Sequence, residues 1–165
     1  MQTRSITTFL AAAALCGLAS FATLAQAQVL QYGTNVTHEQ ARTAMAGAVA
    51  DARKQNLPMA IAVVDTAGQL VAFERMDGTQ IGSVAVSQDK AVSAALFRRP
   101  TKVFQDALAA GGAGLRILTL RGANAIEGGI PLTAADGKII GAIGVSGGSA
   151  EQDGVVAKAG MDAMK

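Results

Sequence analysis

The stretch from Lys138 to Ser146 constrains the fold of this chain more than any other, because from Ile139 onward its side chains are apolar or small on both faces. Alternate residues of a β-strand point to opposite faces of the sheet. A strand that is apolar on both faces lies inside a sheet that is covered on both sides. We therefore expect a central strand with helices packed against each face. One face carries Ile139, Gly141, Ile143 and Val145, and the other carries Ile140, Ala142 and Gly144.

Two hairpins and four helices complete the expected fold. Strands over residues 59–64 and 69–75 flank a turn at 65–68, and strands over 130–133 and 138–146 flank a turn at 134–137. Periodic small and apolar residues predict helices over 38–55, 81–97, 101–108 and from 150 to the C-terminus. We expect an α/β (α+β) fold with a single domain, in which an antiparallel β-sheet is flanked by helices on both faces.

The sequence also indicates where helices begin and where the chain is interrupted between them. Thr37 with Gln40, and Ser149 with Gln152, have the spacing of capping boxes, which satisfy the free N–H groups of a helix start. Asp153, one turn into the last helix, is expected to stabilise the positive end of that helix. The cluster Gly111-Gly112-Ala113-Gly114 predicts a flexible break.

The first 27 residues have the layout of a secretory signal peptide. A basic start at Arg4 precedes an apolar run from Phe9 to Leu24, and Ala25-Gln26-Ala27 is a small-x-small cleavage site. Small polar residues interrupt the run, which argues against stable membrane insertion. We therefore expect residues 1–27 to be removed, residues 28–165 to form the mature domain, and the protein to be secreted or periplasmic.

Removal of this segment limits the kinds of reaction and metal site that the mature chain can support. Cys16 is the only cysteine, so its loss excludes thiol catalysis, structural zinc held by cysteine and iron–sulfur clusters. The mature chain then has 13 basic and 12 acidic side chains, one Tyr and no Trp. This composition offers nucleic acid neither a basic stripe nor a stacking surface, so we expect no nucleic-acid partner.

The segment Gly144-Val145-Ser146-Gly147-Gly148 matches the Gly-x-Ser-x-Gly of a nucleophile elbow. In that fold the histidine follows the serine, whereas the only histidine here, His38, precedes it. We therefore interpret the segment as a strand end, a tight turn and a helix start, which can attract an anion or a polar ligand group.

Five motifs follow one another along the mature chain: Val63-Val64-Asp65-x-x-Gly68, Arg75-Met76-Asp77-Gly78, Lys90-Ala91-x-x-Ala94, Gly128-Gly129-Ile130-Pro131 and Gly141 to Gly148, with Asp153 after the last. In this order and spacing they resemble the GlcG/HbpS-like family, which is related to the C-terminal domain of the PduO cobalamin adenosyltransferases. The resemblance covers essentially the whole mature chain. It implies an antiparallel sheet with helices on both sides, assembly into multimers and, for secreted members, binding of haem. Because a small domain rich in Ala and Gly can also present flat helix faces that bury each other, we expect a homo-oligomer larger than a dimer.

Several residues are candidates for holding haem. His38 is the only imidazole, a common haem iron ligand, and the first turn of a helix suits a surface or intersubunit site; the same position suits a polar residue that binds nothing. Tyr32 is either a phenolate ligand or a packing residue. Arg98 and Arg99 either meet haem propionates or complement a helix C-terminus. The other candidate cofactor contacts are Gly128, Gly129, Ser146 and Gly147.

A second group of residues is a candidate for catalysis. Asp77 and Lys90 form a possible pair for a carboxylate, propionate or hydroxyl lying near Gly128-Gly129; the alternative is a turn-forming aspartate and a lysine on a solvated helix face. Glu127 is a candidate general acid or base. A lone histidine and scattered carboxylates do not make a histidine-rich metal site within one chain.

Three functions remain open from these residues. The first is an exported haem- or tetrapyrrole-binding protein with a haem-degrading or sensing role, which the signal peptide and the family resemblance favour. The second is a cofactor-free small-molecule enzyme of lyase or isomerase type, with a pocket at the Gly128–Pro131 loop. The third is a structural or interaction module that acts as a multimer.

Overall fold

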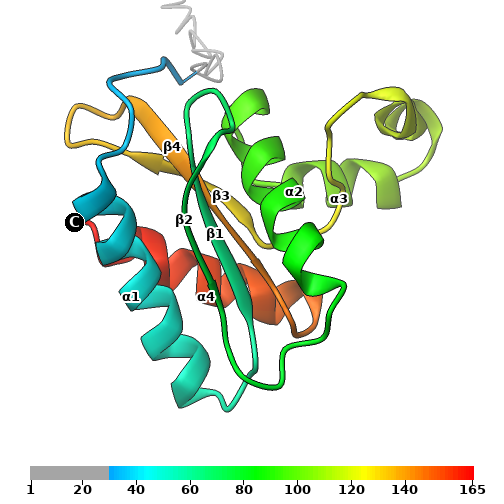
Figure 1. Ribbon diagram of the computed structural model, residues 1–165. Coiled ribbons are helices and arrows are strands. Elements are labelled where there is room, and N and C mark those ends of the chain that lie inside the picture. The colour runs from blue at the N-terminus through cyan, green and yellow to red at the C-terminus, as the bar shows by residue number, and fades with distance from the viewer. Residues whose placement is uncertain (1–29) are drawn as a thin grey trace, which may run out of the picture.

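The computed structural model describes residues 30–165, so the expected signal peptide and Cys16 lie outside the described residues. Figure 1 shows one sheet with helices on both sides, which confirms the expected α/β fold with an antiparallel sheet. In chain order the elements are α1 (His38–Lys54), β1 (Ala60–Asp65), β2 (Leu70–Arg75), α2 (Ser83–Phe97), α3 (Lys102–Ala109), the 3-10 helix η1 (Gly112–Thr119), β3 (Gly129–Thr133), β4 (Ile139–Ser146) and α4 (Ala150–Asp162).

The strand β4 is the central strand that the sequence predicts. The sheet order is β2-β1-β4-β3, and every neighbouring pair is antiparallel. All residues of β4 are buried, whereas every residue of the edge strand β2 is exposed or half-buried. The strand β4 is therefore hydrogen-bonded on both edges and covered on both faces, which makes it the most central element of the fold.

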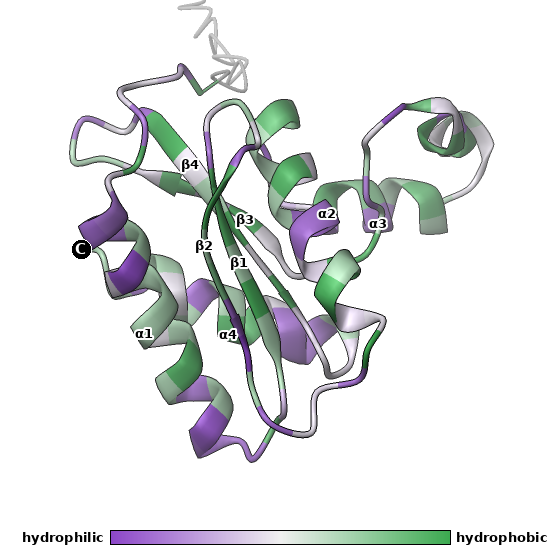
Figure 2. Ribbon diagram, in the orientation of Figure 1, coloured by the Kyte–Doolittle hydropathy of each residue, from purple (hydrophilic) through white to green (hydrophobic). Residues whose placement is uncertain are grey.

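The helices α1 and α4 cover one face of the sheet. The main hydrophobic core lies there, and the two central strands contribute Ile61 and Val63 of β1 and Ile143 and Val145 of β4 to it. Figure 2 shows these strands in the colours of hydrophobic residues along most of their length. The alternation of side chains along the two strands thus places the largest apolar groups on a single face.

Both of these helices begin at the expected capping boxes. Thr37 Oγ1 accepts a hydrogen bond from Gln40 N at 3.2 Å, and Ser149 Oγ accepts one from Gln152 N at 3.3 Å. The two glutamine side chains accept hydrogen bonds from the N–H groups of Thr37 and Ser149 in return. These bonds satisfy donors that a helix start otherwise leaves free.

The helix α2 covers the other face and lies close to it, because both surfaces consist of small residues. A Cβ on Gly144 of β4 would collide with the backbone of Ser87 and would lie 2.9 Å from Ala91 Cβ. A glycine is therefore needed where α2 crosses β4. The small residues that meet in this layer are Ser83, Ser87, Ala91, Ala94 and Ala95 of α2, with Ala62 and Ala142 of the sheet.

The long connection between α2 and β3 spans residues 98–128, and its part from 98 to 126 is called the arm below. It holds α3 and η1, and Figure 1 shows it extending away from the sheet beyond α2. The flexible break expected at Gly111–Gly114 is wrong, because residues 112–119 form η1 and Gly114 N donates to Gly111 O at 2.9 Å. Gly111 and Gly112 have φ of 68° and 53°, so these glycines turn the chain directly from α3 into η1.

Between residues 30 and 165, no helix has both the length and the apolar character that crossing a membrane requires.

Candidate functional site

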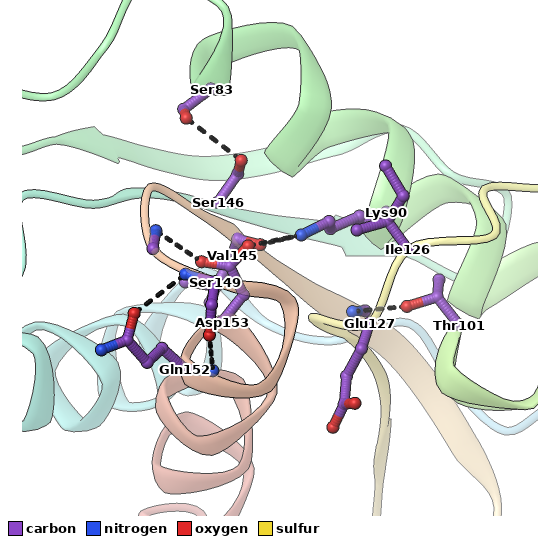
Figure 3. Close-up of polar contacts among 12 residues, drawn as sticks. Ser83, Lys90, Thr101, Ile126, Glu127, Val145, Ser146, Ser149, Gln152 and Asp153 are labelled. Atoms are coloured by element: carbon purple, nitrogen blue, oxygen red, sulfur yellow. Dashed lines mark hydrogen bonds and ion pairs between the residues drawn. The ribbon is translucent and has the colours of Figure 1, made fainter. Parts of the chain in front are cut away.

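A buried ion pair joins α2 to α4. Lys90 is fully buried and Asp153 is 3% exposed. Lys90 Nζ donates to Asp153 Oδ2 at 2.6 Å and to Val145 O at 3.1 Å (Figure 3). Gly148 N donates to the other carboxylate oxygen, Asp153 Oδ1, at 2.9 Å. The pair thus ties α2 and α4 to the end of β4 and to the turn that follows it.

Burial dominates the electrostatics of this pair. Burial raises the pKa of the Asp153 carboxyl above its usual value, and this effect outweighs the hydrogen bonds from Lys90 and Gly148, which lower that pKa. A carboxylate in this position depends on the ammonium group of Lys90 for its charge balance. The two residues therefore act as one unit.

The structure does not bring Lys90 together with Asp77. Lys90 faces Asp153, whereas Asp77 is exposed and lines a hollow with Arg53 and Arg75. The alternative of a lysine on a solvated helix face is excluded, because its side chain is buried. The reason is that Lys90 lies on the same face of α2 as the small residues that pack on the sheet.

The loop before β3 packs directly against the buried pair. Gly128 and Gly129 are buried, and a Cβ on Gly128, which has φ of 127°, would lie 2.9 Å from Lys90 Nζ. Gly129 N donates to Thr101 Oγ1 at 2.9 Å. The helix α2 and Thr101 fill the space beside these glycines, so the loop is tightly packed. Neither glycine lines the hollows that contain His38, Tyr32 or Asp77.

Glu127 directly precedes these two glycines and lies at the edge of the packed loop. Its side chain is 19% exposed, its carboxylate packs against Gly154 of α4, and Glu127 Oε2 lies 3.9 Å from Lys102 Nζ. It is therefore near the Lys90–Asp153 pair without bonding to it.

Ser146 and Gly147 lie at the end of β4, between the two backbone groups, Val145 O and Gly148 N, that bond to the buried pair. Ser146 is buried, and its Oγ donates to Ser83 Oγ at 3.1 Å, so the hydroxyl faces another hydroxyl (Figure 3). A hydroxyl is no general base, which agrees with the exclusion of a nucleophile elbow. A Cβ on Gly147 would collide with Pro58 O and lie 2.8 Å from Met59 Sδ, so close backbone packing explains this glycine.

His38 lies on a separate, open hollow of about 350 Å³ between α1 and the edge strand β2. It is exposed in the first turn of α1, as expected. Imidazole is a common haem iron ligand, and the Arg42 guanidinium suits a carboxylate such as a propionate. Phe73 and Met45 add apolar surface. This set of side chains fits a haem held at the protein surface.

Tyr32 lines a different hollow from His38. Tyr32 Oη donates to Ala95 O at 2.9 Å, and the Arg98 guanidinium lies 5.4 Å from the centre of the Tyr32 ring. These contacts hold the N-terminal segment on the end of α2. Arg99 lies 5.6 Å from the centre of the Phe104 ring, at the base of the arm.

Within the part of the chain that the structure describes, no three His, Cys, Asp or Glu side chains gather in a way that could hold a metal ion.

This chain is similar to one known family and to several known proteins. The family model of the haem degrading protein HbpS-like family matches residues 36–162. Protein GlcG of Escherichia coli strain K12 is 39% identical over 111 residues, which cover 67% of this chain and 81% of GlcG. The crystal structure of HbpS has a TM-score of 0.71 and 31% identity, over 81% of this chain and 92% of that chain. The crystal structure of the PduOC complex with haem has a TM-score of 0.69 and 25% identity, over 79% of this chain and 95% of that chain.

Proposed function

Since the chain belongs to the haem degrading protein HbpS-like family, as its motifs predicted, we propose that it is an exported haem-binding protein. The observation that carries the proposal is the exposed His38 in its hollow. The similar PduOC structure contains haem, which supports the same class of ligand. The signal-peptide layout of residues 1–27 supports export.

Four of the side chains that line the hollow have a distinct part in the proposal. His38 would bind the iron through its imidazole, and Arg42 would pair with a propionate. Phe73 and Met45 would cover part of the porphyrin face. Bound haem would supply a redox-active iron, and these residues of the chain would hold and orient it.

The test is a haemin titration of the mature protein, followed by visible absorption. We expect a defined Soret band with saturable binding, and we expect His38→Ala to shift the band and to weaken binding at least tenfold. Glu39→Ala is the matched control, because Glu39 is exposed in the same helical turn and does not line the hollow. Equal spectra and affinities for His38→Ala and the wild type would refute His38 as the ligand.

Breakdown of the bound haem is a second candidate function, which the name of the family favours. The same complex, given ascorbate and dioxygen, would lose its Soret band and release iron faster than free haemin. A stable band under these conditions leaves storage or sensing as the role of the bound haem.

A further inference from the structure

The arm carries an exposed segment of leucines and arginines, residues 115–121, which is called the tip below. Leu115, Leu118 and Leu120 of the tip are 52%, 73% and 42% exposed. Twelve large hydrophobic side chains are exposed among residues 30–165, and five of them lie in the arm. Neighbouring apolar side chains that face solvent together indicate a surface that contacts a protein or a membrane.

The tip has a defined conformation that holds these leucines away from the sheet. Ile117, in the middle of the tip, is buried, and Leu120 N donates to Ile117 O at 3.0 Å. Thr119 Oγ1 donates to Arg116 O at 2.7 Å. Figure 1 shows η1, which contains most of the tip, at the far side of the arm from the sheet. The exposed leucines therefore form a fixed surface.

The charges of the tip are basic and unpaired. Arg116 and Arg121 lie beside the leucines, are exposed, and form no ion pair with any residue that the structure describes. The sequence has no acidic residue between Asp106 and Glu127.

The charge of the whole molecule is divided in the same direction. The arm has five basic side chains and one acidic one, a net charge of +4. The other described residues, 30–97 and 127–165, have eight basic and eleven acidic side chains, a net charge of −3. A negatively charged surface would therefore attract the arm and repel the rest of the molecule, so that the tip turns toward that surface.

The composition of the tip favours a lipid surface over the surface of a protein. Trp and Tyr are enriched among the side chains that dominate the energy of protein interfaces, whereas leucine is under-represented there. The tip has three exposed leucines and no aromatic side chain. Leucines on one side and cations on the other are typical of segments that lie at the boundary between lipid headgroups and acyl chains.

From these observations we propose that the tip binds the surface of an anionic membrane. The three leucines enter the headgroup region, and the two arginines pair with lipid phosphates. Such binding combines two weak signals, apolar burial and charge, and needs no helix that spans the bilayer. It is independent of haem binding, because every residue that lines the His38 hollow lies outside the arm.

The test measures how much of the mature protein sediments with vesicles of mixed phosphatidylglycerol and phosphatidylcholine. We expect the wild type to sediment with these vesicles and to bind vesicles of pure phosphatidylcholine at least tenfold more weakly. Leu118→Glu should weaken binding at least tenfold, whereas Leu118→Met should keep it. Val155→Glu is the matched control and should also keep it, because Val155 is 54% exposed on α4, outside the arm. A wild type that does not sediment would overturn the proposal.

A pair of double variants tests whether the charge acts at the tip. Arg116→Gln with Arg121→Gln should weaken binding at least tenfold, and added salt should weaken binding of the wild type. Arg53→Gln with Lys54→Gln removes the same charge from the exposed end of α1 and should leave binding intact. Equal losses for the two double variants would overturn the proposal, because net charge alone would then explain the binding.

Light scattering without vesicles distinguishes membrane binding from a contact between copies of the chain. Leu118→Glu should have the same mass and the same far-ultraviolet circular dichroism as the wild type, because the Leu118 side chain is exposed. A smaller mass for Leu118→Glu would also overturn the proposal, because the tip would then be covered by another copy.

Discussion

Lys90 and Asp153 bury opposite charges at 2.6 Å, and each is the counter-charge of the other. We expect Asp153→Asn and Lys90→Met each to lower the free energy of unfolding by about 3–5 kcal/mol, because each leaves one buried charge unpaired. The double variant Lys90→Met with Asp153→Leu should recover most of this loss, since neither charge remains. Urea unfolding of the three variants measures the difference.

Asp162→Asn is the control for this comparison, because Asp162 pairs with Lys158 at the surface. Solvent screens such a pair, so the change should be much smaller. Single variants that unfold at the wild-type urea concentration would show that the buried pair contributes nothing to stability.

At the scale of elements, the close contact between α2 and β4 requires that residue 144 has no side chain, as glycine does. We expect Gly144→Ala to destabilise the protein by about 1–3 kcal/mol or more, because its Cβ would force α2 away from the sheet. Gly82→Ala is the matched control: Gly82 has φ of −61° at the start of α2, and nothing lies within 4 Å of an added Cβ. Thermal melting of both variants tests this packing, and equal melting temperatures would contradict it.

The elements were predictable where the sequence signal is local. The central strand follows from two apolar faces, and both capping boxes follow from a spacing of three residues. The helix η1 was not predicted from the sequence, because a glycine cluster permits a sharp turn between two helices as readily as a flexible break. In the structure Ile117 of η1 is buried, and this packing could not be read from the glycines themselves.

The candidate site was predictable in part. Ser83, Ser87, Lys90 and Ala94 share one helical face, so the burial of Lys90 was readable from its spacing. Its partner was not, since Asp153 lies 63 residues away and is brought near only by the packing of α2 and α4 on β4. The exposure of His38 followed from its place in the first helical turn, while the lining of its hollow by β2 required the fold.

For the whole molecule, the layout of residues 1–27 makes a prediction about the mature chain. We expect the protein recovered from the periplasm or the medium to begin at Gln28, because Ala25-Gln26-Ala27 is a small-x-small site. N-terminal sequencing or intact mass measures this directly. Recovery of a chain that still begins at Met1 would contradict cleavage at this site.

The position of β4 late in the chain governs when the molecule can fold. A nascent chain that ends before Ile139 has only the β1–β2 hairpin, because β3 pairs with β4 alone. A lone hairpin is marginally stable at best, and Lys90 has no counter-charge until Asp153 is synthesised. We therefore expect the chain to stay unfolded during synthesis until residues 139–165, about the last sixth of it, have been made. An unfolded chain is the form that can thread through a narrow translocation channel.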